Sequence, residues 1–178
     1  MTRRSTVFIG ILLAYALGVG VLMYRLLSDI DPRYRESAEE SLVETAHLLA
    51  AQVEQSSAEG RLDAEQLRPV FRKLYSRSFS AQIFGFEKTD VEMQALVIAR
   101  DGTVVFDSIG QREGEDYSQW RDVRAALAGE YRARTTPKIP GDELSSVMYV
   151  SAPVRDAAGA IVGVVSVGKP VQSLNQFV

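Results

Sequence analysis

Cysteine is absent from this chain of 178 residues, and histidine occurs once, at His47. Without cysteine there is no disulfide, no thiolate metal site and no cysteine nucleophile. One histidine leaves no histidine-rich metal cluster, and a Ser-His-Asp hydrolase would need His47 itself at its active site. No local spacing supplies a nucleophile with its base or a paired acid site. We therefore predict no catalytic residue and no metal site, and an anchored extracytoplasmic enzyme is the weaker alternative.

One stretch near the end of the chain imitates a nucleotide-binding loop. Residues 163–170, GVVSVGKP, nearly match G-x-x-x-x-G-K-[ST], in which glycines, lysine and a hydroxyl hold phosphates and Mg²⁺. Pro170 stands where the hydroxyl is required, and the β-branched valines favour a strand over a tight loop. Because the stretch is apolar on both faces, we predict that it is the last, central strand of an antiparallel sheet.

The chain opens on a long apolar run. Residues 7–24 carry no charge and, with the residues that follow, approach the roughly 20 residues that span a bilayer. Arg3 and Arg4 precede the run, so the positive-inside rule predicts a cytoplasmic segment over 1–6, a transmembrane helix over 7–27 and a body outside. A cleaved signal peptide is the alternative. Its small-residue site at 14–16 falls in the middle of the run, so we favour an uncleaved anchor.

Charge argues against nucleic acid as a partner. The chain has 20 basic and 23 acidic residues. Three of the basic residues, Arg3, Arg4 and Arg25, flank the apolar run, so the body beyond it is more acidic than the whole chain. An acidic body repels phosphate backbones, and we predict a membrane protein that binds no nucleic acid.

The first part of the body has helical periodicity. Residues 31–55 place apolar side chains every three or four positions, which predicts a long helix with Pro32 in its first turn. This helix continues the membrane helix directly or after a short break at 29–32, and its stripe would also pair with a second copy. A second helix is predicted over 63–77. Residues 78–90 are interpreted as irregular, with aromatic side chains packed against the core.

The rest of the body alternates like strands. Asp101 and Gly102 form a strong hairpin signal between the first two strands. Ser118 is predicted to cap a short helix over 116–129, which Trp120 helps to bury and Gly129 terminates. The predicted strands are 93–99, 103–108, 130–136, 145–154 and 160–168. The predicted fold class is therefore α+β, with the long helix packed on a central antiparallel sheet of about five strands.

This order of elements resembles the extracytoplasmic PAS-like sensor domains of the single Cache or PDC type. The segments VFDS, GEDYSQWRDV, YRARTT, SSVMYVSAPV and VGVVSVGKP, all within 104–170, are similar to the sensor region of the CreC family of sensor histidine kinases. The resemblance covers essentially the whole chain. It implies a periplasmic sensor domain over 28–170, followed at 171–178 by the start of an exit segment toward a second transmembrane helix.

The resemblance also implies a function and partners. The chain would be the signal-input domain of a homodimeric kinase in the bacterial inner membrane, acting through a CreB-like response regulator. ATP and Mg²⁺ would belong to a kinase domain outside this chain, which itself has no cofactor. His47 lacks the acid and proline of a phosphoacceptor motif and is expected on a helix surface. A chemoreceptor, a cyclic-dinucleotide enzyme, or a module that binds a membrane-protein partner are the alternatives for the output.

In the resembled fold, small ligands bind the sheet face opposite the long helix. Arg134 is the predicted clamp for a small anion, because a guanidinium can hold a carboxylate or phosphate with two hydrogen bonds. The alternative is an edge-strand arginine paired with Asp or Glu. The other residues expected at this site are Tyr117, Ser146, Tyr149 and Arg132.

Overall fold

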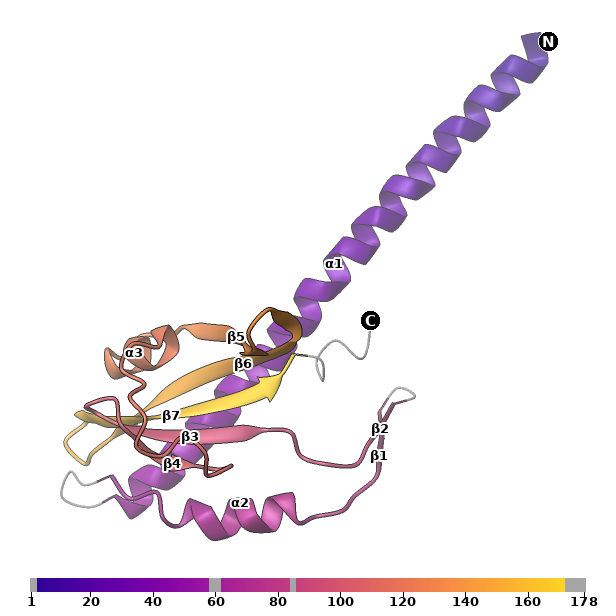
Figure 1. Cartoon of the computed structure of the whole chain (residues 1–178). Helices are drawn as coiled ribbons and strands as arrows, with labels where there is room; N and C mark the ends of the chain where they lie inside the picture. Colours follow the sequence, from indigo (N-terminus) through magenta and orange to yellow (C-terminus); the bar gives the residue numbers. More distant parts are fainter. Residues whose placement is uncertain (1–2, 58–61, 84–85, 172–178) are drawn as a thin grey trace.

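The computed structural model describes residues 3–57, 62–83 and 86–171, which form an antiparallel sheet with helices on both faces (Figure 1). The sheet has five strands in the order β4-β3-β7-β6-β5. This agrees with the predicted α+β class. The strands are β3 (Gln94–Ala99), β4 (Val104–Asp107), β5 (Ala133–Ile139), β6 (Asp142–Arg155) and β7 (Ile161–Pro170).

Helix α1 (Arg3–Ser56) runs without interruption from the apolar start of the chain to the sheet. At 1.5 Å per residue its length is about 80 Å. Residues Phe8–Arg25 are long and apolar enough to cross a membrane, and none of this window is buried. The first-turn position predicted for Pro32 is wrong, because α1 runs through this residue without interruption. A proline inside a helix removes one backbone hydrogen bond and costs about 3 kcal/mol.

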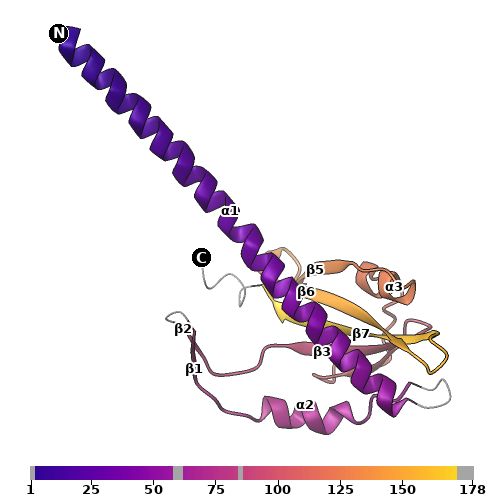
Figure 2. The same cartoon turned by 180° about the vertical axis from the view of Figure 1, so that it is seen from behind.

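The C-terminal part of α1 lies across one face of the sheet, as Figure 2 shows from behind. Leu42, Ala46, Leu49 and Val53 recur at helical spacing and are buried in the core on that face. Helix α2 (Leu67–Tyr75) adds Leu67 and Phe71 to the same core. It is shorter than the predicted 63–77 helix, because Asp63 accepts the amide hydrogen of Glu65 in a turn before the helix begins. His47 is exposed on α1, as predicted.

The opposite face is covered by α3 (Arg121–Leu127) and the loop that precedes it. Val123 is fully buried and Trp120 and Leu127 are partly buried against this second core, as the periodicity predicts. The predicted Ser118 cap is wrong. Trp120 holds the N-cap position, and the Ser118 amide instead donates to Asp116 at 2.8 Å. Gly129, at φ 77°, ends the helix as predicted.

Strand β7 confirms the interpretation of GVVSVGKP as a central strand. It pairs with β3 on one side and β6 on the other. Val164 contributes to the core under α3, whereas Val165 and Val167 contribute to the core under α1. A segment paired on both edges and buried on both faces has no free backbone amides with which to wrap a phosphate.

One predicted strand and one segment interpreted as irregular need correction. The strand predicted at 130–136 begins at Ala133, because the Glu130 amide closes the end of α3 by donating to the Ala125 carbonyl. It continues through Pro137, which an edge strand tolerates. Residues 78–90 are not irregular throughout: β1 (Ala81–Ile83) and β2 (Phe86–Lys88) form a separate hairpin. Of the aromatic residues expected to pack on the core, Phe79 is exposed, whereas Phe84 and the side chain of Phe86 lie outside the described residues. The core face is already covered by α1 and α2.

Candidate functional site

A buried ion pair occupies the centre of the sheet face under α3. Arg134 of β5 donates from Nε to Asp122 Oδ1 of α3 at 2.7 Å. The Asp122 side chain is fully buried and that of Arg134 nearly so. Asp122 Oδ2 also accepts hydrogen bonds from Ser151 at 3.0 Å and Ser166 at 3.3 Å. One carboxylate thus ties α3 to the three strands β5, β6 and β7.

Two aromatic rings enclose the Arg134 guanidinium. Its Cζ lies 4.1 Å from the centre of the Trp120 ring and 4.2 Å from that of Tyr149. Cation–π contacts of this kind contribute about 0.5 to 2 kcal/mol each, with the larger values for desolvated sites. The Nη1 atom donates to Thr136 Oγ1 at 2.9 Å. The guanidinium is held on both faces and at its edge.

This geometry resembles a receptor site for a carboxylate, but the carboxylate comes from the chain itself. The predicted alternative for Arg134, an arginine paired with an acid, is what the structure contains. A ligand anion could bind Arg134 Nε only by displacing Asp122 from it. Leaving either partner of a buried pair without the other costs about 3 to 5 kcal/mol, so such an exchange needs a tightly matched ligand.

The sequence-predicted residues divide between the two faces. Tyr117 and Tyr149 are buried on the same face as Arg134. Burial raises the pKa of the Tyr117 hydroxyl, although the positive charge of Arg112 opposes the shift. Arg132 precedes β5 and is exposed.

Ser146 lies apart from the other predicted residues. Successive side chains of a strand point to opposite faces, and Ser146 shares the parity of Met148 and Val150 in the core under α1. Its buried hydroxyl has no hydrogen-bond partner among the described residues. A ligand on the α3 face would therefore be out of its reach.

Sequence reasoning missed a second polar group on this face, centred on Arg112. Its Nη1 atom lies 3.3 Å from Gln94 Oε1 and 3.3 Å from the Tyr149 hydroxyl. The Tyr149 ring reaches Arg112 by lying across Gly168 of β7, where an added Cβ would approach Tyr149 Cε1 to 2.4 Å. The glycine of the imitated phosphate motif thus makes room for an aromatic ring.

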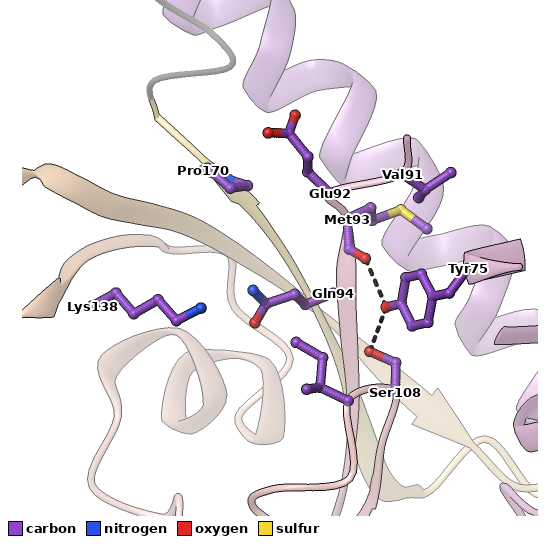
Figure 3. Close-up of a pocket in the computed structure, with 9 residues that line it drawn as sticks. Tyr75, Val91, Glu92, Met93, Gln94, Ser108, Lys138 and Pro170 are labelled. Atoms are coloured by element: carbon purple, nitrogen blue, oxygen red, sulfur yellow. Dashed lines mark hydrogen bonds between the residues drawn. The ribbon is translucent and has the colours of Figure 1, made fainter. Parts of the chain in front are cut away.

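An open pocket of about 470 Å³ lies beyond Gln94 (Figure 3). Its residue Pro170 is at the end of the sheet from which α1 departs (Figure 1). Figure 3 shows the Lys138 side chain extending toward Gln94. Pro170, the last residue of β7, forms part of the lining. The remaining lining residues are Tyr75, Val91, Glu92, Met93, Ser108 and Ile109.

The Tyr75 wall of this pocket is internally satisfied. The Tyr75 hydroxyl lies 2.8 Å from the Met93 carbonyl oxygen and 2.9 Å from Ser108 Oγ, and the Ala95 amide donates to the same Ser108 oxygen. A phenol has one proton, so one of the two Tyr75 bonds is donated by Ser108. Burial raises the pKa of Tyr75. The hydroxyls of this wall are therefore engaged in structural hydrogen bonds. Among the described residues, neither the Lys138 ammonium nor the amide nitrogen of Gln94 has a hydrogen-bond partner.

A second hollow, of about 480 Å³, lies on the other side of Tyr75 between α2 and β4. Its Arg68 guanidinium is already paired with Glu65 at 2.8 Å and Glu113 at 2.7 Å. Asp107, also in the lining, is saturated by the amides of Ile109, Gln111 and Arg112. In the described part of the chain, no three His, Cys, Asp or Glu side chains gather in a metal-binding arrangement.

Known proteins give the fold and the site a context. No family model matches the chain. Sensor protein CreC of Escherichia coli (strain K12) is 39% identical over 164 residues, which are 90% of this chain. The chain spans about a third of that relative, 34% of its length.

Solved structures support the fold. The sensor domain of the V. cholerae histidine kinase DctB superposes with a TM-score of 0.55 at 15% identity, covering 88% of this chain and 59% of that one. The E. coli DcuS sensor domain gives a TM-score of 0.51 at 17% identity, covering 81% of this chain and 96% of that one. At such identities the likeness concerns the fold, which is that of a PAS-like sensor domain.

Proposed function

We propose that this chain, a relative of the sensor protein CreC with the fold of periplasmic kinase sensor domains, is the signal-input domain of a membrane-bound two-component sensor histidine kinase. The observation that carries the proposal is the 39% identity to CreC over 90% of the chain. Identity of this extent accompanies a shared fold and a shared place in the parent protein. Kinase activity itself would belong to a part of the parent that this chain does not include.

The architecture supports a role in relaying a signal. Helix α1 connects the apolar run directly to the core beneath the sheet. Strand β7 ends at Pro170 on the side of the sheet toward which the N-terminal half of α1 projects (Figure 1). A change in the sheet would therefore act on two segments directed at the same membrane. We place the domain in the periplasm, anchored in the inner membrane.

The partners follow from the same kinship. We propose a homodimer, formed through α1 and the apolar run, and a CreB-like response regulator that receives the output. The input would be a small anion bound on the sheet face under α3. At the centre of that face, Arg134, Tyr117 and Tyr149 would contact it only after Asp122 is displaced.

A chimera tests the function. In E. coli lacking CreC, a protein that joins this chain to the remainder of CreC should restore expression from a reporter that depends on the CreB regulator. A chimera with a scrambled sequence over 36–171 serves as the control for expression and insertion. A chimera that is expressed and inserted but gives the same reporter output as the scrambled control would contradict the proposal.

A further inference from the structure

We propose that the pocket bounded by Lys138, Gln94 and Pro170 binds a small organic anion that has an apolar body. Its volume, about 470 Å³, falls within the range of pockets that hold small molecules. It is separate from the central cluster of Arg134, so an anion can enter without breaking the buried ion pair.

The charge of Lys138 is the first reason for an anion. Among the residues that the structure describes, Arg134, Arg68 and Lys88 each form a salt bridge, whereas Lys138 forms none. Lys138 is exposed at the edge of the sheet, and its side chain extends over the pocket (Figure 3). An ammonium group in this position presents its donors to whatever occupies the space in front of Gln94.

The orientation of Gln94 is the second reason. Its side chain is buried, and its Oε1 accepts from Arg112, which has only donors. The amide nitrogen of Gln94 is thereby left as a donor toward the pocket. An oxyanion between Lys138 and Gln94 would meet donors from both sides, with the Arg112 guanidinium behind the amide.

One acid lines the pocket: Glu92, whose carboxylate is paired with Lys88 at 2.8 Å and points away from Lys138 and Gln94 in Figure 3. The rest of the lining favours a ligand with an apolar body. Ile109 and Tyr75 are partly exposed large side chains at the rim, and Met93 and Pro170 lie beside them. The Tyr75 and Ser108 hydroxyls already bond to each other and to the backbone. A carboxylate or phosphate ester with a short aliphatic or aromatic group matches this combination, whereas a highly hydroxylated ligand would leave its own polar groups unsatisfied.

The geometry favours an anion from solution over a bilayer lipid. The candidate span ends at Arg25, whereas the first α1 side chain packed against the core of the sheet is that of Ala38. Thirteen helical residues separate these points by about 20 Å. The interfacial layer of a bilayer is only about 5 to 8 Å thick on each side, so a headgroup would stop short of the pocket.

A bound anion would affect signalling because residues at the ends of different strands line the pocket. An anion held by Lys138 and Gln94 would connect the end of β5 to the start of β3, beside the last residue of β7. This consequence rests on the proposed signal-input function, whereas binding itself does not. A ligand shifts the domain only if it binds one conformation more tightly than the other.

The binding test uses the whole chain in nanodiscs of neutral phosphatidylcholine, with hexanoate and benzoate as probes in isothermal titration calorimetry. Lys138→Gln should weaken binding at least about tenfold, as expected for loss of a charge-assisted hydrogen bond. Lys138→Arg should retain binding within about threefold, since the charge is kept. Lys73→Gln, which removes an exposed lysine outside the pocket, is the matched control and should have no effect. Gln94→Glu should abolish binding, because a second anion would face the ligand.

Three results would overturn the proposal: no binding of either probe at millimolar concentration, equal binding of hexanol, or equal weakening by Lys138→Gln and Lys73→Gln. Repeating the titration in phosphatidylglycerol nanodiscs distinguishes the source of the anion. Unchanged hexanoate affinity supports a free ligand, and competition by the lipid that disappears in Lys138→Gln contradicts it. Binding without any response of the CreC chimera would leave the pocket intact and count against the proposed function alone.

Discussion

At the scale of single residues, the carboxylate of Asp122 decides what the central face of the sheet can bind. Arg134, Ser151 and Ser166 all direct donors at it. A pair buried this deeply stabilises the fold weakly in net terms, yet removing one partner leaves an uncompensated charge. The Arg134 site is therefore occupied by the Asp122 carboxylate, which holds α3 against the sheet.

The variant Asp122→Ala tests whether this carboxylate holds α3 against the sheet. The variant should unfold with a free energy about 3 to 5 kcal/mol below that of the unmodified chain, because Arg134 is left buried and unpaired. Formate or acetate at millimolar concentration should restore part of the thermal stability by entering the vacated position, whereas chloride at equal ionic strength should restore less. Asp90→Ala, at an exposed position, is the control. Equal effects of formate on both variants would contradict a carboxylate site.

Lys169, next to the end of β7, should make the stability of the fold depend on pH in a direction that can be predicted. Burial, together with nearby Lys88, lowers the pKa of its ammonium group. The folded chain therefore releases this proton at lower pH than the unfolded chain does. Between the pKa of Lys169 in the folded chain and its ordinary value of about 10.5, the unfolded state binds more protons than the folded state. The free energy of unfolding therefore rises with pH in this range. Below the range, the contribution of Lys169 to that free energy does not change with pH.

Lys169→Met should accordingly be more stable than the unmodified chain at pH 7, because no ammonium is desolvated. The difference in Tm between the two should shrink as pH rises toward 10.5, where the native lysine loses its charge. Thermal unfolding followed by circular dichroism from pH 7 to 10.5 measures this, with Lys73→Met as the exposed control. A difference that stays constant or grows with pH would refute the assignment.

At the scale of elements, α1 has one face for the sheet and another for solvent. Leu42 and Leu49 are buried against the strands, whereas Leu48 is 70% exposed. Tyr131 contacts Glu39, and the Arg155 amide donates to Glu54 at 2.7 Å, which marks the flanks of the packed face. The outward face is free to meet a second copy of the helix.

Cysteine scanning tests that arrangement in membranes, and the chain has no native cysteine to interfere. Single cysteines at Ser41, Glu44, Leu48 and Ala51 should crosslink between copies under mild oxidation, because these positions lie on the exposed face. Cysteines at Glu39 and Glu54 should crosslink far less. A flat profile along 36–55, without helical periodicity, would argue against pairing through α1.

The elements were more predictable from sequence than the sites. Two-residue alternation and the Asp101–Gly102 turn indicate the hairpins, and the continuous apolar run of β7 indicates its central place. The same alternation shows that Ser146 and Tyr149, three residues apart, face opposite sides. The packing of α3 and β5 across the sheet decides that Asp122 pairs with Arg134 and that Lys138 extends toward Gln94. The periodicity of the sequence within one helix or strand does not predict this packing.

At the scale of the whole molecule, the sheet connects α1 to the end of β7, the two segments that the proposed function directs at a membrane. The long helix supplies one connection, and β7 is hydrogen-bonded through β6 and β3 to every part of the sheet that a ligand could touch. Because packed cores are not continuously deformable, a change at α3 or at the Lys138 pocket is expected to move the sheet between discrete arrangements.

The most direct test measures autophosphorylation of the purified CreC chimera in nanodiscs with radiolabelled ATP. The account predicts that Asp122→Ala in the sensor part changes the rate of autophosphorylation, and that formate, which refills the carboxylate position, returns the rate toward that of the unmodified chimera. The isolated kinase part, which lacks this chain, should not respond to formate. A rate that is the same with and without Asp122, and with and without formate, would show that the state of this domain does not reach the kinase.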